Sequence, residues 1–340
     1  MNVCIHCFND EELKHFIIVN SDKKGKCDYC SDGFNSELLE ISELLDFFAE
    51  FIGVFKANSN GKVLTKLIQE DWNLFSSESE CHNILSDILL ALGNKEIEPT
   101  SEVDYTDEIL ECCGYWEKLK QEIKWEKRFL TDVTILEDYG WDRFFQQTQE
   151  LSSSNPLFRA RLHYSGNQKV FETLDMGCPD PQIVSAGRGN PLGIPYLYLS
   201  LNLQTTIYEV RATYLDEVSI GIFSPKSNAN IILVDFTESA SAFSKVDSIL
   251  EYTKGMLLKR NISSDLSKPI RRYDSEIEYI PTQFICEYIR YIAPHTDGII
   301  FNSSIHVGGK NIVLFDQKKV ECTSVIMHRI TRVNIESIQI

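Results

Sequence analysis

The sequence predicts an α+β protein, in which a cysteine-rich and helical region precedes a domain of short strands with a few helices. Three observations predict this class: paired cysteines near residue 1, helical apolar spacing over residues 38–129, and short apolar runs of strand type after residue 156. The chain has 340 residues, 43% of them apolar, which is enough for two or more domains with buried cores. Intrinsic disorder is excluded.

The acidic residues are concentrated in one part of the chain. The net charge is −17 at pH 7, and residues 1–150, with 14 basic and 31 acidic side chains, account for all of it. Residues 151–340 contain 19 of each and are neutral. This balance argues against nucleic acid or an anionic membrane as a direct partner.

Signals for export or membrane insertion are lacking in the sequence. No apolar run reaches the roughly 18–20 residues of a membrane helix, and no basic stretch followed by an apolar one occurs at residue 1. We therefore expect a cytoplasmic protein with no membrane partner. Its ten cysteines are expected to be reduced thiols or metal ligands.

Cys4, Cys7, Cys27 and Cys30 form two Cys-x-x-Cys pairs within a predicted first domain, residues 1–34. Four thiolates on two such turns suit a closed tetrahedral Zn²⁺ site, and the lysines between the pairs would help to keep the thiolates ionised. The alternatives are four cysteines without a metal, or a redox-active pair. The spacing favours a structural zinc ion.

Residues 35–150 are predicted to form an acidic helical domain. From Leu38 to Phe55 the apolar residues alternate in steps of three and four, as on one face of an amphipathic helix. Further helical patterns cover residues 63–74, 82–92 and 107–129. Metal-free RNA cleavage by such a bundle would need a facing arginine and histidine, and it is not expected because the first arginine is Arg128.

A polar segment at residues 152–156 marks the predicted boundary of the last domain, residues 151–340. Strand patterns cover residues 158–163, 196–200, 218–223, 231–235, 298–302, 311–315 and 320–329, and helical patterns cover 203–212, 242–259 and 281–292. Short strands with interspersed helices indicate an α+β domain.

Several polar residues of this last domain are candidates for a ligand site. The glycine-rich residues 186–193 allow close approach of backbone to a ligand, and Arg188 within them can bind phosphate through two hydrogen bonds, although an ordinary surface turn has the same composition. Glu209, on a predicted helix, would face the same cleft or be a solvated helix position. Ser303 and Ser304 lack a histidine and a carboxylate at recognisable spacing, which disfavours a Ser-His-Asp hydrolase.

Four segments taken together resemble the RES domain, a family named for its Arg, Glu and Ser. They are residues 157–161 (Leu-Phe-Arg-Ala-Arg), 185–200 (from Ser-Ala-Gly-Arg-Gly-Asn to Leu-Tyr-Leu-Ser), 205–211 (Thr-Thr-Ile-Tyr-Glu-Val-Arg), and 279–284 together with 297–304 and 311–315. The resemblance covers about half of the chain. It implies an ADP-ribosyltransferase-like RES domain in residues 151–340. It also implies that NAD is the substrate and that its nicotinamide–ribose bond is cleaved by hydrolysis or phosphorolysis, as in the toxins of the family.

The resemblance also implies roles for individual residues. The catalytic positions would be Arg159, Glu209 and Ser303, and the NAD-binding positions would be Arg161, Arg188, Asn190, Tyr198, Ser304 and Asn311. The arginines would hold the phosphates, Tyr198 would stack on or orient the nicotinamide or ribose, and Ser304 is a register alternative to Ser303.

Three functions are compatible with this resemblance: an NAD-degrading toxin or defence enzyme, an ADP-ribosyltransferase that modifies a macromolecule, and a non-enzymatic interaction module with a degenerate NAD fold. The joint presence of Arg159, Arg188, Tyr198, Glu209 and Ser303 favours an active enzyme. A cognate antitoxin protein is an expected partner because RES toxins are commonly paired with one, and a homo-oligomer is left open. The region before residue 151 is expected to regulate access to the NAD site or to dock a partner.

Overall fold

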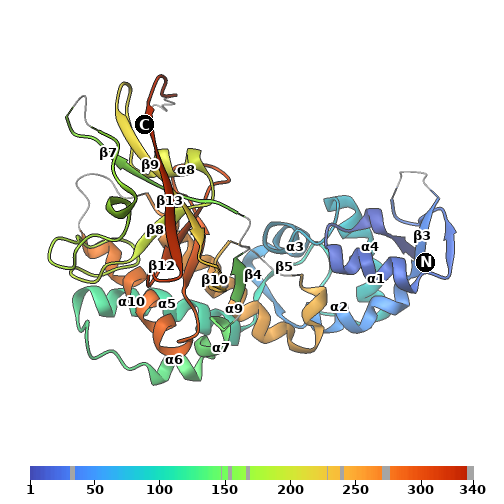
Figure 1. The fold of residues 1–340 in the computed structure, drawn as a ribbon. Helices are drawn as coiled ribbons and strands as arrows, with labels where there is room; N and C mark the ends of the chain where they lie inside the picture. Colours follow the sequence, from blue (N-terminus) through green and yellow to red (C-terminus); the bar gives the residue numbers. More distant parts are fainter. Residues whose placement is uncertain are drawn as a thin grey trace. The chain divides into compact units, whose positions relative to one another are not determined.

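The structure is a computed structural model that describes residues 1–30, 35–146, 148–151, 155–165, 169–227, 229–237, 241–269 and 276–334. The chain divides into two compact units, each made of two stretches of sequence (Figure 1). Unit 1 comprises Met1–Tyr115 and Ser239–Leu257, and unit 2 comprises Trp116–Glu238 and Leu258–Ile340. The three-domain division predicted from the sequence stays a prediction.

Unit 1 combines helices with two small antiparallel sheets, one of three strands in the order β1-β3-β2 and one formed by β4 and β5. Its elements are β1 (Asn2–Cys4), η1 (Ile5–Cys7), α1 (Glu11–Asn20), β2 (Lys23–Gly25), β3 (Ser36–Glu40), η2 (Ile41–Leu44), α2 (Leu45–Ile52), β4 (Phe55–Val63), α3 (Leu64–Trp72), α4 (Glu78–Ala91), β5 (Glu102–Tyr105), η4 (Phe243–Ser248) and the first parts of α5 (Asp107–Trp125) and α9 (Ile249–Ser267).

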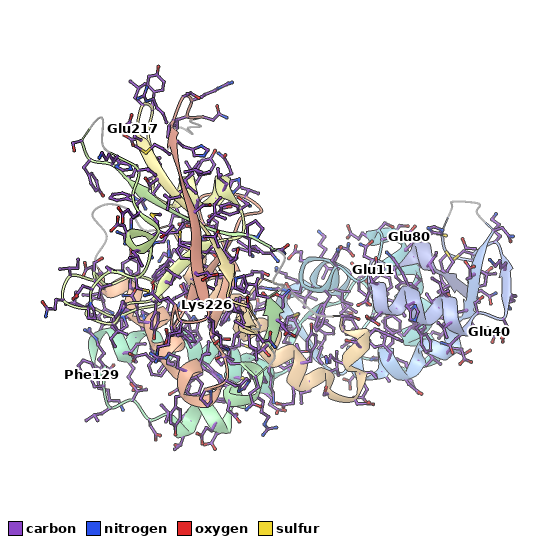
Figure 2. All side chains as sticks on the ribbon, in the orientation of Figure 1. Glu11, Glu40, Glu80, Phe129, Glu217 and Lys226 are labelled. Atoms are coloured by element: carbon purple, nitrogen blue, oxygen red, sulfur yellow. The ribbon has the colours of Figure 1, made fainter. Side chains whose placement is uncertain are left out.

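The core of unit 1 contains a cluster of aromatic rings among aliphatic side chains, and acidic side chains such as Glu11 and Glu40 lie on its surface. Phe8, Phe48 and Phe75 are fully buried, with ring centroids 5.4 Å apart for Phe8 and Phe75 and 6.1 Å apart for Phe48 and Phe75. Figure 2 shows Glu11 and Glu40 on the surface of this unit, where their side chains are 84% and 65% exposed. The negative charge predicted for this part of the chain is therefore carried at least partly by solvated carboxylates.

The predicted helix over residues 38–55 is only partly present. Residues 36–40 form β3 instead, and helix α2 begins at Leu45. β3 pairs with β1 on one side and with β2 on the other, and these backbone hydrogen bonds outweigh the helical spacing of the apolar side chains. Strands β4 and β5 were also not predicted.

Unit 2 contains an eight-stranded mixed sheet in the order β13-β9-β7-β8-β12-β11-β10-β6, which confirms the predicted α+β class. Its strands are β6 (Thr148–Leu151), β7 (Leu157–Leu162), β8 (Leu197–Ser200), β9 (Glu217–Pro225), β10 (Ile231–Asp235), β11 (Gly298–Asn302), β12 (Lys310–Leu314) and β13 (Val320–Arg329). The helical elements are α6 (Thr134–Asp138), α7 (Trp141–Phe144), η3 (Thr173–Met176), α8 (Leu203–Glu209), η5 (Glu276–Tyr279), α10 (Ile280–Ile292) and the last parts of α5 and α9. Within this unit, the sequence patterns did not predict β6, α6 or α7.

Apolar side chains pack on both faces of this sheet. Because side chains alternate along a strand, Leu157 and Ala160 of β7 belong to two different clusters. The Ala160 cluster includes Leu203 and Ile207, which attach α8 to the sheet, and Asn202 caps this helix by accepting a hydrogen bond of 2.8 Å from the Thr205 backbone N–H. Among the described residues, no helix is both long and apolar enough to cross a membrane.

Candidate active site

A cavity of about 370 Å³ lies in unit 2 where β7 and β8 separate. The two strands pair at Phe158 with Ser200, and the described residues form no further pair between them. The residues that line the cavity are Arg159, Ala160, Gly187, Arg188, Tyr198, Leu199, Ser200, Thr206, Glu209, Val210, Tyr279, Phe301, Ser304 and Asn311. Its volume is in the range of pockets that bind small molecules.

Glu209, the last residue of α8, is held in this cavity by two hydrogen bonds to the same oxygen. Ser303 Oγ donates at 2.7 Å and Asn311 Nδ2 donates at 2.6 Å, both to Glu209 Oε1. The Ser303 hydroxyl in turn accepts from the backbone N–H groups of Ile305 and His306, at 3.3 and 3.2 Å. These two donors direct the single hydroxyl proton of Ser303 toward the carboxylate.

A buried serine sets the orientation of the Asn311 amide. Ser200 Oγ donates to Asn311 Oδ1 at 2.8 Å, and Ser200 and Asn311 are only 3% and 8% exposed. The amide NH₂ is therefore turned toward Glu209. Among the described residues Glu209 Oε2 has no hydrogen-bond partner, so this oxygen is available to a ligand.

The glycine-rich loop is fixed against β8 by Tyr198. Its hydroxyl donates to Asn190 Oδ1 at 2.7 Å and accepts from the Gly189 backbone N–H at 2.9 Å. A Cβ atom at Gly187 would lie 2.6 Å from the Tyr198 hydroxyl oxygen, so only glycine allows this approach. Burial raises the pKa of Tyr198, which keeps the hydroxyl protonated as the donor to Asn190.

Two arginines of the cavity are largely removed from water. Burial, and then the neighbouring Arg161, lower the pKa of Arg159 to about 10, and burial also lowers the pKa of Arg188. Arg159 Nη1 and Arg161 Nη2 both donate to the carbonyl oxygen of Gly177, at 2.9 and 3.1 Å. Arg159 forms no ion pair with a carboxylate of the described residues. A desolvated cation without a counter-charge is suited to an anionic ligand.

Comparison with protein families matches residues 156–334 of this chain to the RES domain, which is more than half of the sequence. The chain belongs to the RES domain family. This confirms the resemblance stated from the sequence, and at the level of the family it supports a toxin-type, NAD-related enzymatic role. No curated protein and no solved structure matches the chain.

Most of the site residues predicted from the RES resemblance meet in one place. Those on the cavity wall are Arg159, Arg188, Tyr198, Glu209, Ser304 and Asn311. Ser303 joins them through its hydrogen bond to Glu209. Arg161 and Asn190 are not among the lining residues, because Arg161 lies one repeat further along β7 and Asn190 is buried inside the loop, where its Nδ2 donates to the carbonyl oxygen of Ser185 at 3.1 Å. Their roles toward NAD stay predictions.

The sequence did not single out several residues of the RES cavity. Ser200, Thr206 and Tyr279 line it and occur in segments that carry the resemblance, but no residue pattern marked them as site residues. Phe301 is an apolar residue of β11 that the strand pattern explains as core. A signal for Ser200 was its position as the polar end of an apolar strand.

The four N-terminal cysteines form a second candidate site, in unit 1. All four are buried, and their Sγ atoms lie within 4.8 Å of one another. Hydrogen bonding between their sulfur atoms raises the pKa of the Cys4 thiol and lowers that of Cys27. Four thiolates at this separation repel one another, so a bound cation would be needed to hold them together. Two of the lysines between the cysteine pairs are paired with glutamates, Lys23 with Glu40 and Lys24 with Glu37. The cluster is one that could hold a metal ion.

Proposed function

We propose that this RES protein cleaves the bond between the nicotinamide and the ribose of NAD, as an NAD glycohydrolase or NAD phosphorylase, and acts as a toxin or defence enzyme by depleting cellular NAD. The observation that carries the proposal is the presence of one carboxylate, Glu209, and two desolvated arginines, Arg159 and Arg188, on the wall of one cavity in the RES domain.

The arginines give the cavity the charge that a dinucleotide requires. NAD carries a pyrophosphate, and a guanidinium can bind phosphate oxygens through two parallel hydrogen bonds. Arg159 has no carboxylate partner among the described residues, so a phosphate would supply its counter-charge. Binding energy from the pyrophosphate would then hold the scissile bond close to Glu209.

The chemistry requires stabilisation of positive charge more than proton transfer. Nicotinamide leaves NAD as a neutral molecule, so its departure needs no general acid, and positive charge develops on the ribose. An ionised Glu209 would stabilise this oxocarbenium-like transition state, as carboxylates do in glycosidases. Ser303 and Asn311 orient the carboxylate by donating to Oε1, which leaves Oε2 for the substrate. Because its proton is directed to Glu209, we assign Ser303 a positioning role and not that of the nucleophile.

The identity of the products tests the proposal. The purified protein should be incubated with NAD, with and without phosphate, and the products identified by mass spectrometry. We expect nicotinamide together with ADP-ribose if water is the acceptor, or ADP-ribose-1″-phosphate if phosphate is. Transfer of ADP-ribose to protein or nucleic acid would instead identify a transferase. Binding of NAD without any product would identify a non-enzymatic module.

Replacing Arg159 by methionine is expected to stabilise the ligand-free protein while weakening NAD binding. At pH 7 this guanidinium is charged in both the folded and the unfolded chain, and a folded-state pKa of about 10 corresponds to a cost of about 3 kcal/mol. The hydrogen bond to Gly177 offsets about 1 kcal/mol of this. The melting temperature should rise by about 5 °C, and the Kd for NAD should rise at least about tenfold.

A control for this substitution is Arg260→Met, which removes an exposed arginine on α9. It should leave the Kd for NAD unchanged. If Arg159→Met lowers the melting temperature and binds NAD as tightly as the wild type, the anion-binding role of Arg159 is wrong.

We propose that the cysteine cluster holds a structural zinc ion. A tetrahedral site with Zn–S bonds of about 2.3 Å separates its sulfur atoms by about 3.8 Å. The Sγ atom of Cys4 lies 4.0 Å from that of Cys7 and 3.5 Å from that of Cys30. The Sγ atoms of Cys7 and Cys27 lie 3.4 Å apart. Four sulfur ligands would fill the shell and leave no position for a substrate, which is typical of a structural site.

The RES family is associated in general with antitoxin partners. For this chain we propose a cognate antitoxin protein that binds over the cavity and blocks NAD cleavage. Loss of NAD cleavage on mixing with that protein, restored by its removal, would support this partner. Unchanged cleavage in the mixture would reject it.

A further inference from the structure

The second half of α5 lies outside the segment that matches the RES family, yet it belongs to unit 2. We propose that Lys120 and Lys124 of this helix are positioning residues of the NAD site, which hold Arg188 and Tyr279 in place. This inference rests on the proposed function, because the ligand that these residues would serve is NAD.

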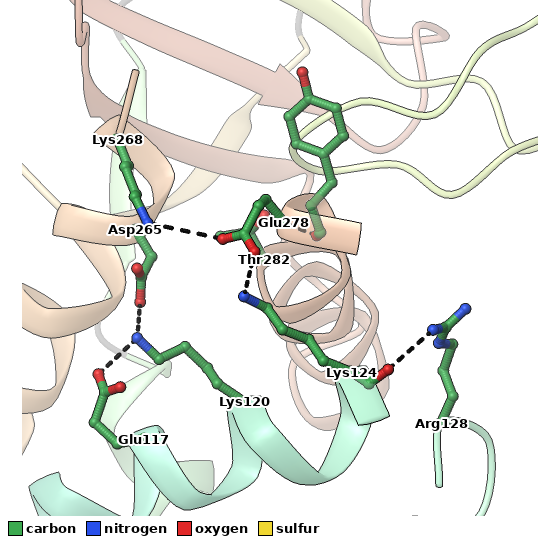
Figure 3. A network of polar contacts seen from close by, with 9 residues as sticks. Glu117, Lys120, Lys124, Arg128, Asp265, Lys268, Glu278 and Thr282 are labelled. Atoms are coloured by element: carbon green, nitrogen blue, oxygen red, sulfur yellow. Dashed lines mark hydrogen bonds and ion pairs between the residues drawn. The ribbon is translucent and has the colours of Figure 1, made fainter. Parts of the chain in front are cut away.

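Lys120 anchors the end of α9. Its Nζ lies 2.8 Å from Asp265 Oδ2 and 2.6 Å from Glu117 Oε1. Figure 3 draws both contacts as dashed lines. The same Asp265 oxygen accepts a hydrogen bond of 2.7 Å from Trp116 Nε1, and Trp116 is fully buried. Lys120 is itself only 13% exposed, so this contact is shielded from solvent. Asp265 is thus held by two donors from α5.

Lys124, one turn further along α5, anchors the element that leads into α10. Its Nζ lies 3.0 Å from Glu278 Oε1, and its side chain is 11% exposed (Figure 3). Lys268 lies on the other side of Glu278, with 3.7 Å between its Nζ and Glu278 Oε2. The carboxylate of Glu278 is therefore shared by cations from α5 and from the end of α9.

Each anchored residue is the chain neighbour of a residue that serves the cavity. Leu266 follows Asp265, and its carbonyl oxygen accepts a hydrogen bond of 2.8 Å from Arg188 Nη1. Tyr279 follows Glu278 and lines the cavity. A small displacement of Asp265 would therefore move the guanidinium of Arg188, and one of Glu278 would move the ring of Tyr279.

Thr282 joins the two halves of this arrangement. Its hydroxyl contacts the backbone carbonyl oxygen of Arg188 at 2.6 Å and that of Tyr279 at 3.0 Å. Arg188 is thus fixed at its side chain by Leu266 and at its backbone by Thr282, and both contacts depend on elements that α5 holds. The geometry explains how a helix outside the family match can set the position of a substrate-binding arginine.

The test is NAD affinity in the full-length protein, measured by calorimetry in a Glu209→Gln background so that NAD is not consumed. Lys124→Met should raise the Kd for NAD about tenfold, because Glu278 keeps Lys268 as a partner and the fold survives while the anchor to α5 is lost. Lys124→Arg, which keeps the charge, should restore the affinity. The matched control is Lys318→Met, which removes the lysine of an exposed ion pair with Asp316 in the same unit.

A purely structural role is separated from positioning by kinetics with Glu209 intact. Lost folding lowers the active fraction and hence kcat, whereas a displaced Arg188 raises KM and leaves kcat within about threefold. Lys120→Met gives a second, independent variant, and melting curves report the folded fraction. If both methionine variants are folded and bind NAD within twofold of Lys318→Met, the inference is overturned. If the Lys318→Met control itself does not bind NAD, the proposed function fails first.

Discussion

Replacement of Glu209 by glutamine should lower the kcat for NAD cleavage at least about 10³-fold, with little change in the Kd for NAD. Glutamine has nearly the same shape and keeps an oxygen that can accept the hydrogen bonds from Ser303 and Asn311. What it lacks is the negative charge that opposes the charge developing on the ribose. The positive charge on the ribose develops only in the transition state. Loss of the negative charge of Glu209 therefore lowers kcat and leaves the bound ground state largely unaffected.

Steady-state kinetics and calorimetry, run on the same preparation, measure the two effects separately. Glu321→Gln is a suitable control, since Glu321 is an exposed residue of β13 that does not line the cavity. It should have wild-type kcat. Equal turnover of NAD by wild type and Glu209→Gln would show that the carboxylate has no role in the mechanism. It would also contradict the proposed stabilisation of the transition state.

Substitution of Cys7 by serine should abolish zinc binding and unfold the first part of unit 1. Cys7 is fully buried, and its Sγ lies within 4.0 Å of the sulfur atoms of Cys4 and Cys27. Structural zinc sites of this kind contribute on the order of 10 kcal/mol to folding, which is comparable to the whole stability of a small domain. Zinc content should fall from one ion per chain to almost none, and hydrogen exchange over residues 1–30 should become fast.

Cys81→Ser is the matched control for this experiment. Cys81 is another fully buried cysteine of unit 1, on α4, and it lies outside the cluster. The control should retain zinc and slow exchange. If wild-type protein purified without chelators contains no metal while residues 1–30 are protected from exchange, the cluster is not a zinc site.

Local patterns predicted most strands of unit 2, because short apolar runs with polar residues at their ends mark them, as at 231–235 and 298–302, whereas the polar strand β6 was missed. They failed at residues 36–40, where Leu38 and its neighbours have helical spacing but lie between two other strands. A sheet depends on partners that are distant in sequence, so helical spacing alone cannot exclude one.

The candidate site was predictable in its residue types but not in its geometry. The strand pattern puts Arg159 and Arg161 on the same face of β7, which leaves them equivalent in sequence. The separation of β7 from β8 distinguishes them, since Arg159 lines the resulting cavity and Arg161 does not. Similarly, nothing local to Ser200 reveals that it orients the amide of Asn311, more than a hundred residues later.

By itself, the sequence determined the membership of the RES family, the α+β class and the cysteine pairs, because each depends on residue types at fixed short spacing. Only the tertiary structure decided which residues meet. It brought Ser303 and Asn311 to one oxygen of Glu209, and it brought Lys120 of α5 to the end of α9. Hydrogen bonds and ion pairs act over a few ångströms, so partners from distant segments become neighbours only once the sheet and its helices have packed.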